Sequence, residues 1–158
     1  MRTLILLRHA HAEPAAAGQA DLDRALSPEG LAEAEAASAW LSAQGLVPDR
    51  VLCSPARRTR ETLEAVLERI GYVEQRLVET IYEATPGTLA ALVDEHREVE
   101  RLMVVGHNPG LERLAALMHS GQSGDYRGMP PAGIAVLSLP MEAAVEPGVA
   151  SLTAFWWP

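Results

Sequence analysis

The chain has 158 residues, of which 48% are hydrophobic, and a formal net charge of −8 at pH 7. This length is typical of one domain with its own core, and no repeat or linker divides the chain, so we expect a single domain over residues 1–158. The excess of acidic residues argues against a sequence-independent nucleic-acid surface. The lone cysteine, Cys53, rules out an internal disulfide and a cysteine-based zinc site, and its apolar neighbours predict a core position.

The first apolar run does not have the length of a targeting segment. It covers residues 4–7, whereas a secretory signal needs roughly 7–15 apolar residues, and Arg8 and His9 end it. No other stretch approaches the length of a membrane span, which is about 20 apolar residues. The sequence therefore predicts a soluble, cytoplasmic protein that binds neither a membrane nor nucleic acid.

Strand and helix patterns alternate along the chain. Short apolar runs predict strands at residues 3–7, 50–53, 77–82, 102–106, 134–139 and 151–157. Polar residues followed by proline predict four helix starts, at Ser27, Ser54, Thr85 and Asn108. This alternation predicts an α/β fold, a three-layer α/β/α sandwich with a mostly parallel central sheet.

Two further patterns predict burial and loop structure. The helix after Ser27 carries apolar or small residues on one face, which are expected to be buried: Leu31, Ala34, Ser38 and Leu41. Residues 120–133 are rich in glycine and proline and predict a long loop. Loops of this length often border active sites, so we expect this one to lie beside the functional site.

Two short histidine segments stand far apart in the sequence, Leu7-Arg8-His9-Ala10 and Gly106-His107-Asn108-Pro109. Each follows an apolar run that predicts a buried strand. Ligands of open α/β sheets collect beyond the carboxyl ends of the strands, so Arg8, His9 and His107 are expected to lie together there. Two imidazoles and a guanidinium in one place predict an anion site that contains a nucleophile.

Basic residues also cluster at Arg57, Arg58 and Arg60, just after the helix start expected at Ser54. Unpaired amides and the macrodipole at a helix start favour an anion. A local positive pocket in an acidic protein would suit capture of a phosphate group. However, Arg57 has the spacing of a surface pair with Glu61, so the cluster by itself supports little.

Taken in order, these segments resemble the histidine phosphatase superfamily, which is phosphoglycerate mutase-like in fold, and within it the compact branch of SixA-type phosphohistidine phosphatases. The resemblance rests on residues 7–10, on Ser54-Pro55-Ala56-Arg57-Arg58-Thr59 with Thr62, and on residues 106–109. Residues 26–30 and 82–84 also fall where such proteins carry similar signatures. The resemblance implies a metal-independent phosphatase that needs no cofactor.

Each position also makes physical sense. Phosphoryl oxygens repel a nucleophile, so the site must supply cations and donors before attack, and Arg8, Arg58 and His107 are expected to bind the phosphoryl group. Surrounding positive charge lowers the pKa of His9 and keeps it neutral. The resemblance implies that His9 becomes a covalent phosphohistidine that water then hydrolyses. In the family the anion-binding arginine lies four positions after the serine, which selects Arg58.

The substrate is left open between alternatives. The resemblance implies phosphohistidine on a signalling protein. Larger members of the superfamily protonate an oxygen leaving group with an acidic residue, and Glu83 is a candidate for that place, which would favour a small phosphomonoester. A third reading, from another class, is a phosphate-binding module without turnover. Ala10 replaces a frequent glycine, and the lack of a family asparagine beyond His11 argues against a mutase.

The remaining polar candidates have simpler interpretations. Asn108 and Ser54 are expected to be helix N-caps. His11 is expected to be an exposed loop residue. His96 and His119 lie near predicted helix ends and are expected to complement the helix dipole.

Overall fold

The computed structural model describes residues 1–125 and 128–158. In these residues the chain forms one six-stranded sheet of order β3-β2-β4-β1-β5-β6. Its strands are β1 (Arg2–Arg8), β2 (Arg50–Cys53), β3 (Glu74–Leu77), β4 (Arg101–Gly106), β5 (Ile134–Leu139) and β6 (Ser151–Trp156). The first four run parallel, whereas β5 and β6 pair antiparallel. The mostly parallel sheet expected from the sequence is confirmed.

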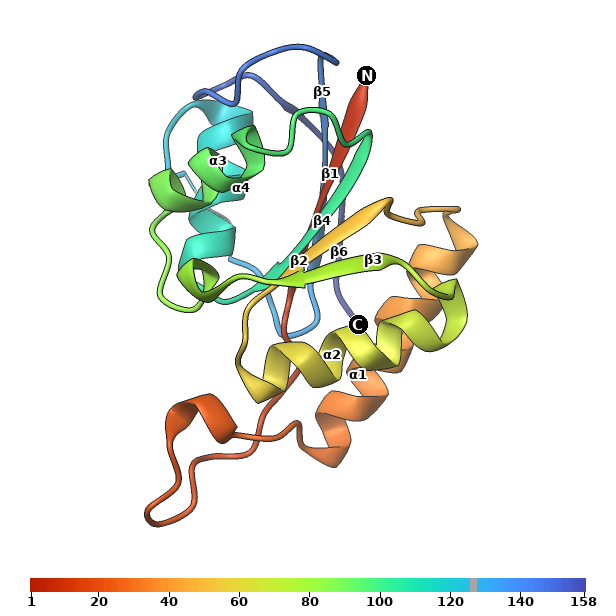
Figure 1. Ribbon diagram of the computed structural model, residues 1–158, viewed down its shortest axis with the longest axis vertical. Coiled ribbons are helices and arrows are strands. Elements are labelled where there is room, and N and C mark those ends of the chain that lie inside the picture. Colours follow the sequence, from red (N-terminus) through yellow and green to blue (C-terminus); the bar gives the residue numbers. More distant parts are fainter. Residues whose placement is uncertain (126–127) are drawn as a thin grey trace.

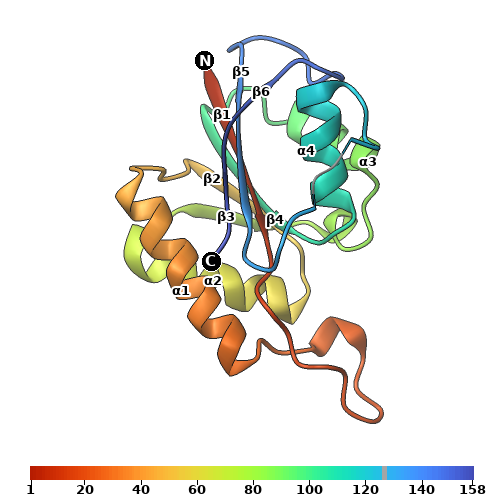
Figure 2. The same ribbon diagram turned by 180° about the vertical axis from the view of Figure 1, so that it is seen from behind.

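Helices cover both faces of this sheet and complete three layers (Figures 1 and 2). The helices of the described chain are α1 (Pro28–Ala43), α2 (Arg57–Ile70), α3 (Pro86–Asp94) and α4 (Gly110–Ser120), with short 3-10 helices η1 (Asp21–Asp23) and η2 (Glu79–Ile81). α1 and α2 pack on one face, and α3 and α4 pack on the other. The α/β sandwich inferred from the alternating pattern is therefore confirmed.

The central strands are apolar throughout because both of their faces are covered. In β1, Leu4 and Leu6 pack toward α3 and α4, whereas Ile5 and Leu7 pack toward α1 and α2. All four side chains are essentially inaccessible to solvent. Cys53, at the end of β2, is also fully buried, as predicted.

The site depends on how three neighbouring strands end. β2, β4 and β1 are adjacent and parallel, so their carboxyl ends meet at one edge of the sheet. The backbone N–H of His9 donates to Gly106 O (3.1 Å), and that of Ser54 donates to Val105 O (3.1 Å). The residues that follow the three strands are thereby tied side by side, although almost a hundred positions separate the first from the last.

The predictions for the third strand and for the buried face of α1 are wrong in detail. The strand expected at residues 77–82 is β3 at Glu74–Leu77 followed by η2, since an edge strand needs no apolar face, and Leu77 is 60% exposed while Ile81 turns into the core. Leu31 of α1 is 48% exposed. The buried stripe of α1 contains Gly30, Ala34 and Leu41, so Leu31 falls outside it.

The remaining segments mostly follow the sequence pattern. The loop expected at residues 120–133 is largely present, but residues 126 and 127 within it lie outside the described residues. Near the C-terminus, the Trp156 ring stacks on Trp40 with centroids 5.5 Å apart. Across the described residues, we find no helix of sufficient length and apolarity to cross a membrane.

Candidate active site

The structure brings the two sequence-predicted histidines together. His9 follows β1, His107 follows β4, and their ring centroids are 5.3 Å apart. Arg8 is the last residue of β1 and Arg58 lies in the first turn of α2, and the charges of both act on the two rings. The four residues expected to form an anion site therefore share one electrostatic environment at the carboxyl edge of the sheet.

His9 is held in one tautomer. Its Nδ1 lies 2.7 Å from the carbonyl oxygen of Ala10. Because a carbonyl oxygen only accepts hydrogen bonds, Nδ1 carries the proton and Nε2 keeps its lone pair. Burial, together with the positive charges of Arg58 and Arg8, lowers the pKa of His9 to about 4, although the hydrogen bond to Ala10 acts in the opposite direction. His9 is thus neutral at pH 7, with Nε2 suited to nucleophilic attack.

His107 is bound on one side only. Its Nε2 lies 2.7 Å from the hydroxyl oxygen of Ser54, while its Nδ1 is buried with no hydrogen-bond partner among the described residues. Burial, followed by the proximity of His9 and Arg58, lowers the pKa of His107 to about 3. A neutral ring with an unsatisfied nitrogen faces the site, which leaves one polar atom for a ligand.

Ser54 is not the N-cap predicted from the sequence. The N-cap of α2 is Ala56, which has no side chain to cap with, and the helix begins at Arg57. The Ser54 hydroxyl instead contacts His107 and accepts a weak bond from the Ala56 N–H (3.3 Å). Ser54, which follows β2, is therefore a site residue, although the Ser-Pro sequence was interpreted as a helix start.

Asn108 was also expected to cap a helix and does not, since the N-cap of α4 is Pro109. The Asn108 side-chain amide donates to Met129 O (2.9 Å) and to Glu112 Oε2 (3.2 Å). Arg8 Nη1 donates to the same Met129 carbonyl (2.8 Å). Both site residues therefore bind the loop between α4 and β5, which borders the site as the sequence predicted.

The three clustered arginines of α2 point in different directions. The Arg58 side chain is 8% exposed, and its Nη1 and Nη2 donate to Asp21 O (2.9 Å) and Asp21 Oδ2 (3.0 Å). Arg57 lies outside the site and pairs with Glu61 at 3.5 Å. Arg60 is exposed, and its Nε donates to Pro55 O. The geometry therefore separates Arg58 from its neighbours, as the motif offset predicted.

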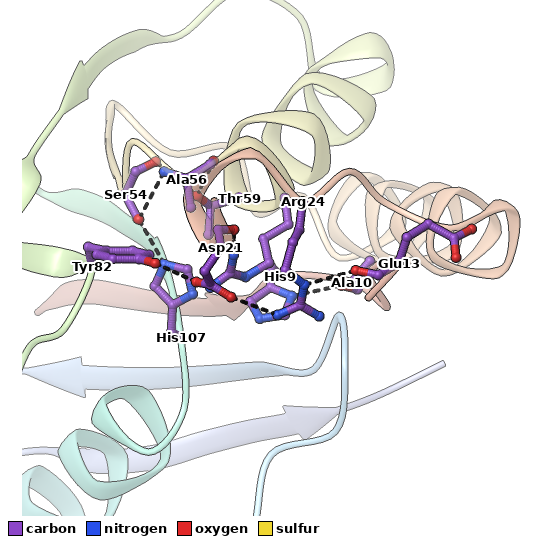
Figure 3. A network of polar contacts seen from close by, with 11 residues as sticks. His9, Ala10, Glu13, Asp21, Arg24, Ser54, Ala56, Thr59, Tyr82 and His107 are labelled. Atoms are coloured by element: carbon purple, nitrogen blue, oxygen red, sulfur yellow. Dashed lines mark hydrogen bonds and ion pairs between the residues drawn. The ribbon is translucent and has the colours of Figure 1, made fainter. Parts of the chain in front are cut away.

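Three further residues at the site received no role from the sequence analysis, namely Asp21, Arg24 and Tyr82, although Tyr82 lies in a segment that resembles a family signature. The Asp21 carboxylate accepts hydrogen bonds from Arg24 Nη1 (3.0 Å) and from the Tyr82 hydroxyl (Figure 3). It also accepts one from Arg58 Nη2 (3.0 Å). The Tyr82 and Arg24 donors hold the pKa of Asp21 well below its usual range. The segment of Asp21 and Arg24 has no periodic pattern, and nothing in its sequence indicates which way it folds.

A cavity of about 370 Å³ opens beside His107. Its wall includes Tyr82, Glu83, Asn108 and Arg113. The Tyr82 ring packs edge-on against the His107 ring, with centroids 5.5 Å apart. Glu83 is exposed on this wall, so the structure brings it to the rim of the cavity that His107 also lines.

The other histidines serve the fold. His11 is exposed as expected, and its Nδ1 lies 2.7 Å from the hydroxyl of Ser27, the N-cap of α1. His119 lies in the last turn of α4, as expected, and His96 lies two residues after the end of α3. His96 Nδ1 accepts a hydrogen bond from Arg50 (2.9 Å), and His119 Nδ1 accepts one from Leu152 N (3.2 Å). In the described chain no three His, Cys, Asp or Glu side chains are arranged to hold a metal ion.

Comparison with known proteins gives a consistent result. The sequence profile of the histidine phosphatase superfamily (branch 1) matches residues 4–105. An uncharacterized protein of Mycobacterium tuberculosis is 38% identical over 151 residues, which cover 89% of this chain and 93% of that protein.

Solved structures resemble the whole chain. A crystal structure assigned as the phosphohistidine phosphatase SixA of Agrobacterium tumefaciens superposes with a TM-score of 0.86 and 31% identity over 99% of this chain and 98% of the other. The protein histidine phosphatase SixA complexed with tungstate has the same fold, with a TM-score of 0.83 and 23% identity over 98% and 96% of the two chains. The chain belongs to the histidine phosphatase superfamily, branch 1.

Proposed function

We propose that this protein hydrolyses phosphoryl groups through a covalent phosphohistidine on His9. The observation that carries the proposal is the 2.7 Å contact of His9 Nδ1 with Ala10 O, which leaves Nε2 unprotonated in a cationic site. Nε2 attacks phosphorus, the bond to the leaving group breaks, and its electron pair departs with the leaving group. Water then attacks phosphorus, releases orthophosphate and restores neutral His9.

In this scheme three groups stabilise the phosphoryl oxygens during both steps. Arg8 and Arg58 are fixed cations beside His9, and fixed charges in a partly buried site need no reorganisation as negative charge develops. His107 adds a donor. If the Ser54 hydroxyl donates to Nε2, the ring proton lies on the unpartnered Nδ1, which then donates to a phosphoryl oxygen.

The substrate we favour is phosphohistidine on a signalling protein. The support is the similarity, over nearly the full length of both chains, to the structure assigned as a phosphohistidine phosphatase SixA. A phosphoramidate has a reactive nitrogen leaving group and does not require a strong general acid at the site. The scheme uses only residues of the chain and calls for no cofactor or metal.

A second candidate is a small phosphomonoester, with Glu83 as the general acid. The observation that favours it is the cavity of about 370 Å³, which has room for a small leaving group and carries Glu83 on its wall. Proton transfer requires Glu83 to come within hydrogen-bond reach of the leaving oxygen.

The test is the ratio of kcat/KM on a phosphohistidine-bearing protein to that on a simple phosphomonoester, with His9→Ala as the blank. A ratio far above one, with turnover abolished in the variant, supports the phosphohistidine assignment, and Glu83→Gln should then retain activity. A ratio below one transfers the assignment to phosphomonoesters. If wild type and His9→Ala are equally inactive while wild type still binds orthophosphate, the chain is a binding module.

A further inference from the structure

The cation expected to bind phosphate is already engaged by a carboxylate. Both terminal nitrogens of Arg58 donate to Asp21, one to its backbone oxygen at 2.9 Å and one to Oδ2 at 3.0 Å. Arg58 Nε is buried and has no partner within the described residues. A phosphoryl group that binds Arg58 must therefore approach a guanidinium that Asp21 already neutralises in part.

Asp21 is held in place by more than Arg58. Its Oδ1 accepts from Arg24 at 3.0 Å, and its Oδ2 accepts from the Tyr82 hydroxyl (Figure 3). Tyr82 itself packs against Arg58, whose guanidinium carbon lies 5.8 Å from the ring centroid. Because several donors from different segments converge on it, the carboxylate is expected to stay in the site when substrate binds.

Asp21 lies near the expected place of the leaving group as well as near the arginine expected to bind the phosphoryl group. Tyr82 contributes to the cavity beside His107, where a leaving group would lie, and its hydroxyl contacts Asp21. Asp21 thus lies between the phosphate-binding arginine and the wall of that cavity. Its own side chain is 51% exposed, so part of the carboxylate faces the open side of the site.

We infer that Asp21 is a specificity-determining residue that favours phosphoramidate substrates over phosphomonoesters, a conclusion that rests on the proposed function of the site. Arg24 and Tyr82 act as positioning residues that hold its carboxylate. The charge of Asp21 selects for substrates whose leaving group bears positive charge and against those whose leaving group becomes negative.

The two reactions place opposite charge beside Asp21. In a phosphohistidine, the substrate ring takes a solvent proton on the nitrogen that does not bear phosphorus and becomes cationic. As the bond from His9 Nε2 to phosphorus forms, the P–N electron pair returns to its nitrogen and the leaving group departs as neutral imidazole. Attack of water on the phosphorylated His9 then releases orthophosphate and returns a proton to solvent. In a phosphomonoester, the P–O electron pair goes to oxygen, which is negative until it is protonated. A nearby carboxylate stabilises the protonated nitrogen and opposes the charge on oxygen.

The experiment compares Asp21→Asn with Asp23→Asn. Asp23 lies in the same short helix and is exposed, and its side chain makes no hydrogen bond to Arg58, so its variant removes the same charge from the same turn. For each protein, kcat/KM is measured on a phosphohistidine peptide and on p-nitrophenyl phosphate. Inhibition by orthophosphate provides a binding readout that does not depend on which substrate is used.

For Asp21→Asn we expect the phosphohistidine-to-ester ratio to fall about tenfold or more and orthophosphate to bind about tenfold more tightly. Asp23→Asn should leave both quantities unchanged. Tyr82→Phe, which removes one donor and keeps the ring, should shift the ratio in the same direction by a smaller factor.

The inference is overturned if Asp21→Asn changes kcat/KM on both substrates by the same factor, or if Asp23→Asn has the same effect as Asp21→Asn. Failure of the proposed function gives a different result: the wild-type protein then shows no turnover that depends on His9. In that case the affinity for orthophosphate still tests the role of Asp21, because a carboxylate that shares Arg58 with the anion must weaken the binding of orthophosphate.

Discussion

At the scale of single residues, the site depends on two imidazoles that stay neutral beside two arginines. Burial is the larger cause of the lowered pKa values of His9 and His107, and the neighbouring cations add to it. Nε2 of His9 has a free lone pair, and can act as a nucleophile, only when the ring is neutral with its proton on Nδ1. The positively charged environment that we propose to attract a phosphoryl group therefore also keeps Nε2 of His9 unprotonated.

Nitrogen NMR of the histidine rings checks this directly. We expect His9 to be neutral at pH 7, protonated at Nδ1 only, and to gain its second proton when the pH falls to about 4, instead of near 6.5. Arg58→Met should raise the pKa of His9 because it removes a nearby cation. Arg57→Met, which removes the cation that pairs with Glu61, should leave it unchanged. Titration of His9 near 6.5 in the wild type would contradict the account.

Ser54 gives a second prediction at this scale. Ser54→Ala removes the 2.7 Å contact to His107 Nε2, so the His107 ring loses the hydrogen bond that orients it. The loss of one such hydrogen bond should lower kcat about tenfold. The matched control is Ser38→Ala, which removes a buried 2.7 Å bond to Val66 O between α1 and α2, far from the site. Equal effects of the two variants on kcat would refute the role of Ser54.

The sequence predicts the two histidines that follow strands and misses the residues that reach the site from irregular segments. His9 and His107 could be placed because the apolar runs before them indicate neighbouring strand ends. Asp21 and Tyr82 could not, because their contact joins positions 61 residues apart through a segment without regular periodicity. Side-chain convergence of this kind depends on the path of a loop, which local patterns do not encode.

At the scale of elements, the four predicted helix N-caps fall into two pairs: two that form away from the site and two at the site that do not. Ser27 and Thr85 cap α1 and α3 as predicted, accepting from Gly30 N (3.0 Å) and Thr88 N (3.1 Å). The two predicted caps that fail, Ser54 and Asn108, are both at the site. Their side chains bind His107 and the Met129 carbonyl instead. Local rules fail here because functional contacts take the groups that would otherwise cap.

Gly30, in the first turn of α1, allows a close approach of two segments. A Cβ at this position would lie 2.0 Å from the carbonyl oxygen of His11, which also accepts from Ser27 N. Gly30→Ala should therefore displace the segment that carries Asp21, destabilise the protein by about 1–3 kcal/mol and lower activity. Urea unfolding and kcat/KM measure the two effects.

The control for this substitution is Gly87→Ala in α3. A Cβ there meets only Thr85 Oγ1 at 3.9 Å, so the added methyl has room. Because alanine is the better helix former, the variant should be stabilised by roughly 0.5–1 kcal/mol. If Gly30→Ala is stabilised as Gly87→Ala is, or is not destabilised, the close approach of His11 to Gly30 does not matter for stability.

At the scale of the whole molecule, the alternating pattern was sufficient for the fold because central strands and amphipathic helices are strongly periodic. It failed at β3, where an exposed edge strand carries no apolar signal. The order of the strands, and therefore the meeting of β2, β4 and β1, follows from parallel crossovers that the sequence only implies. The site is a consequence of that order.

The buried histidines also make folding stability depend on pH. Their folded-state pKa values lie below the unfolded value of about 6.5. Below pH 6.5 the unfolded chain therefore binds protons at these two histidines that the native protein does not bind. Stability is complete above pH 6.5 and is lost as the pH falls from there toward 4. Between pH 7 and pH 5, each of the two should contribute a loss of about 2 kcal/mol.

Urea unfolding at the two pH values measures this loss. His107→Gln should reduce it by about 2 kcal/mol, because one of the two groups is gone. The same pH dependence in wild type and His107→Gln would show that the native site tolerates the protonated ring.

The central claim, a phosphoryl group carried on His9, is tested most directly by trapping it. Turnover is stopped with alkaline denaturant, in which phosphohistidine survives, and the peptide containing residues 8–10 is analysed by mass spectrometry. We predict one added phosphoryl group on His9 in the wild type, and neither label nor turnover in His9→Ala. A label on His107, or turnover that persists without His9, would contradict the account.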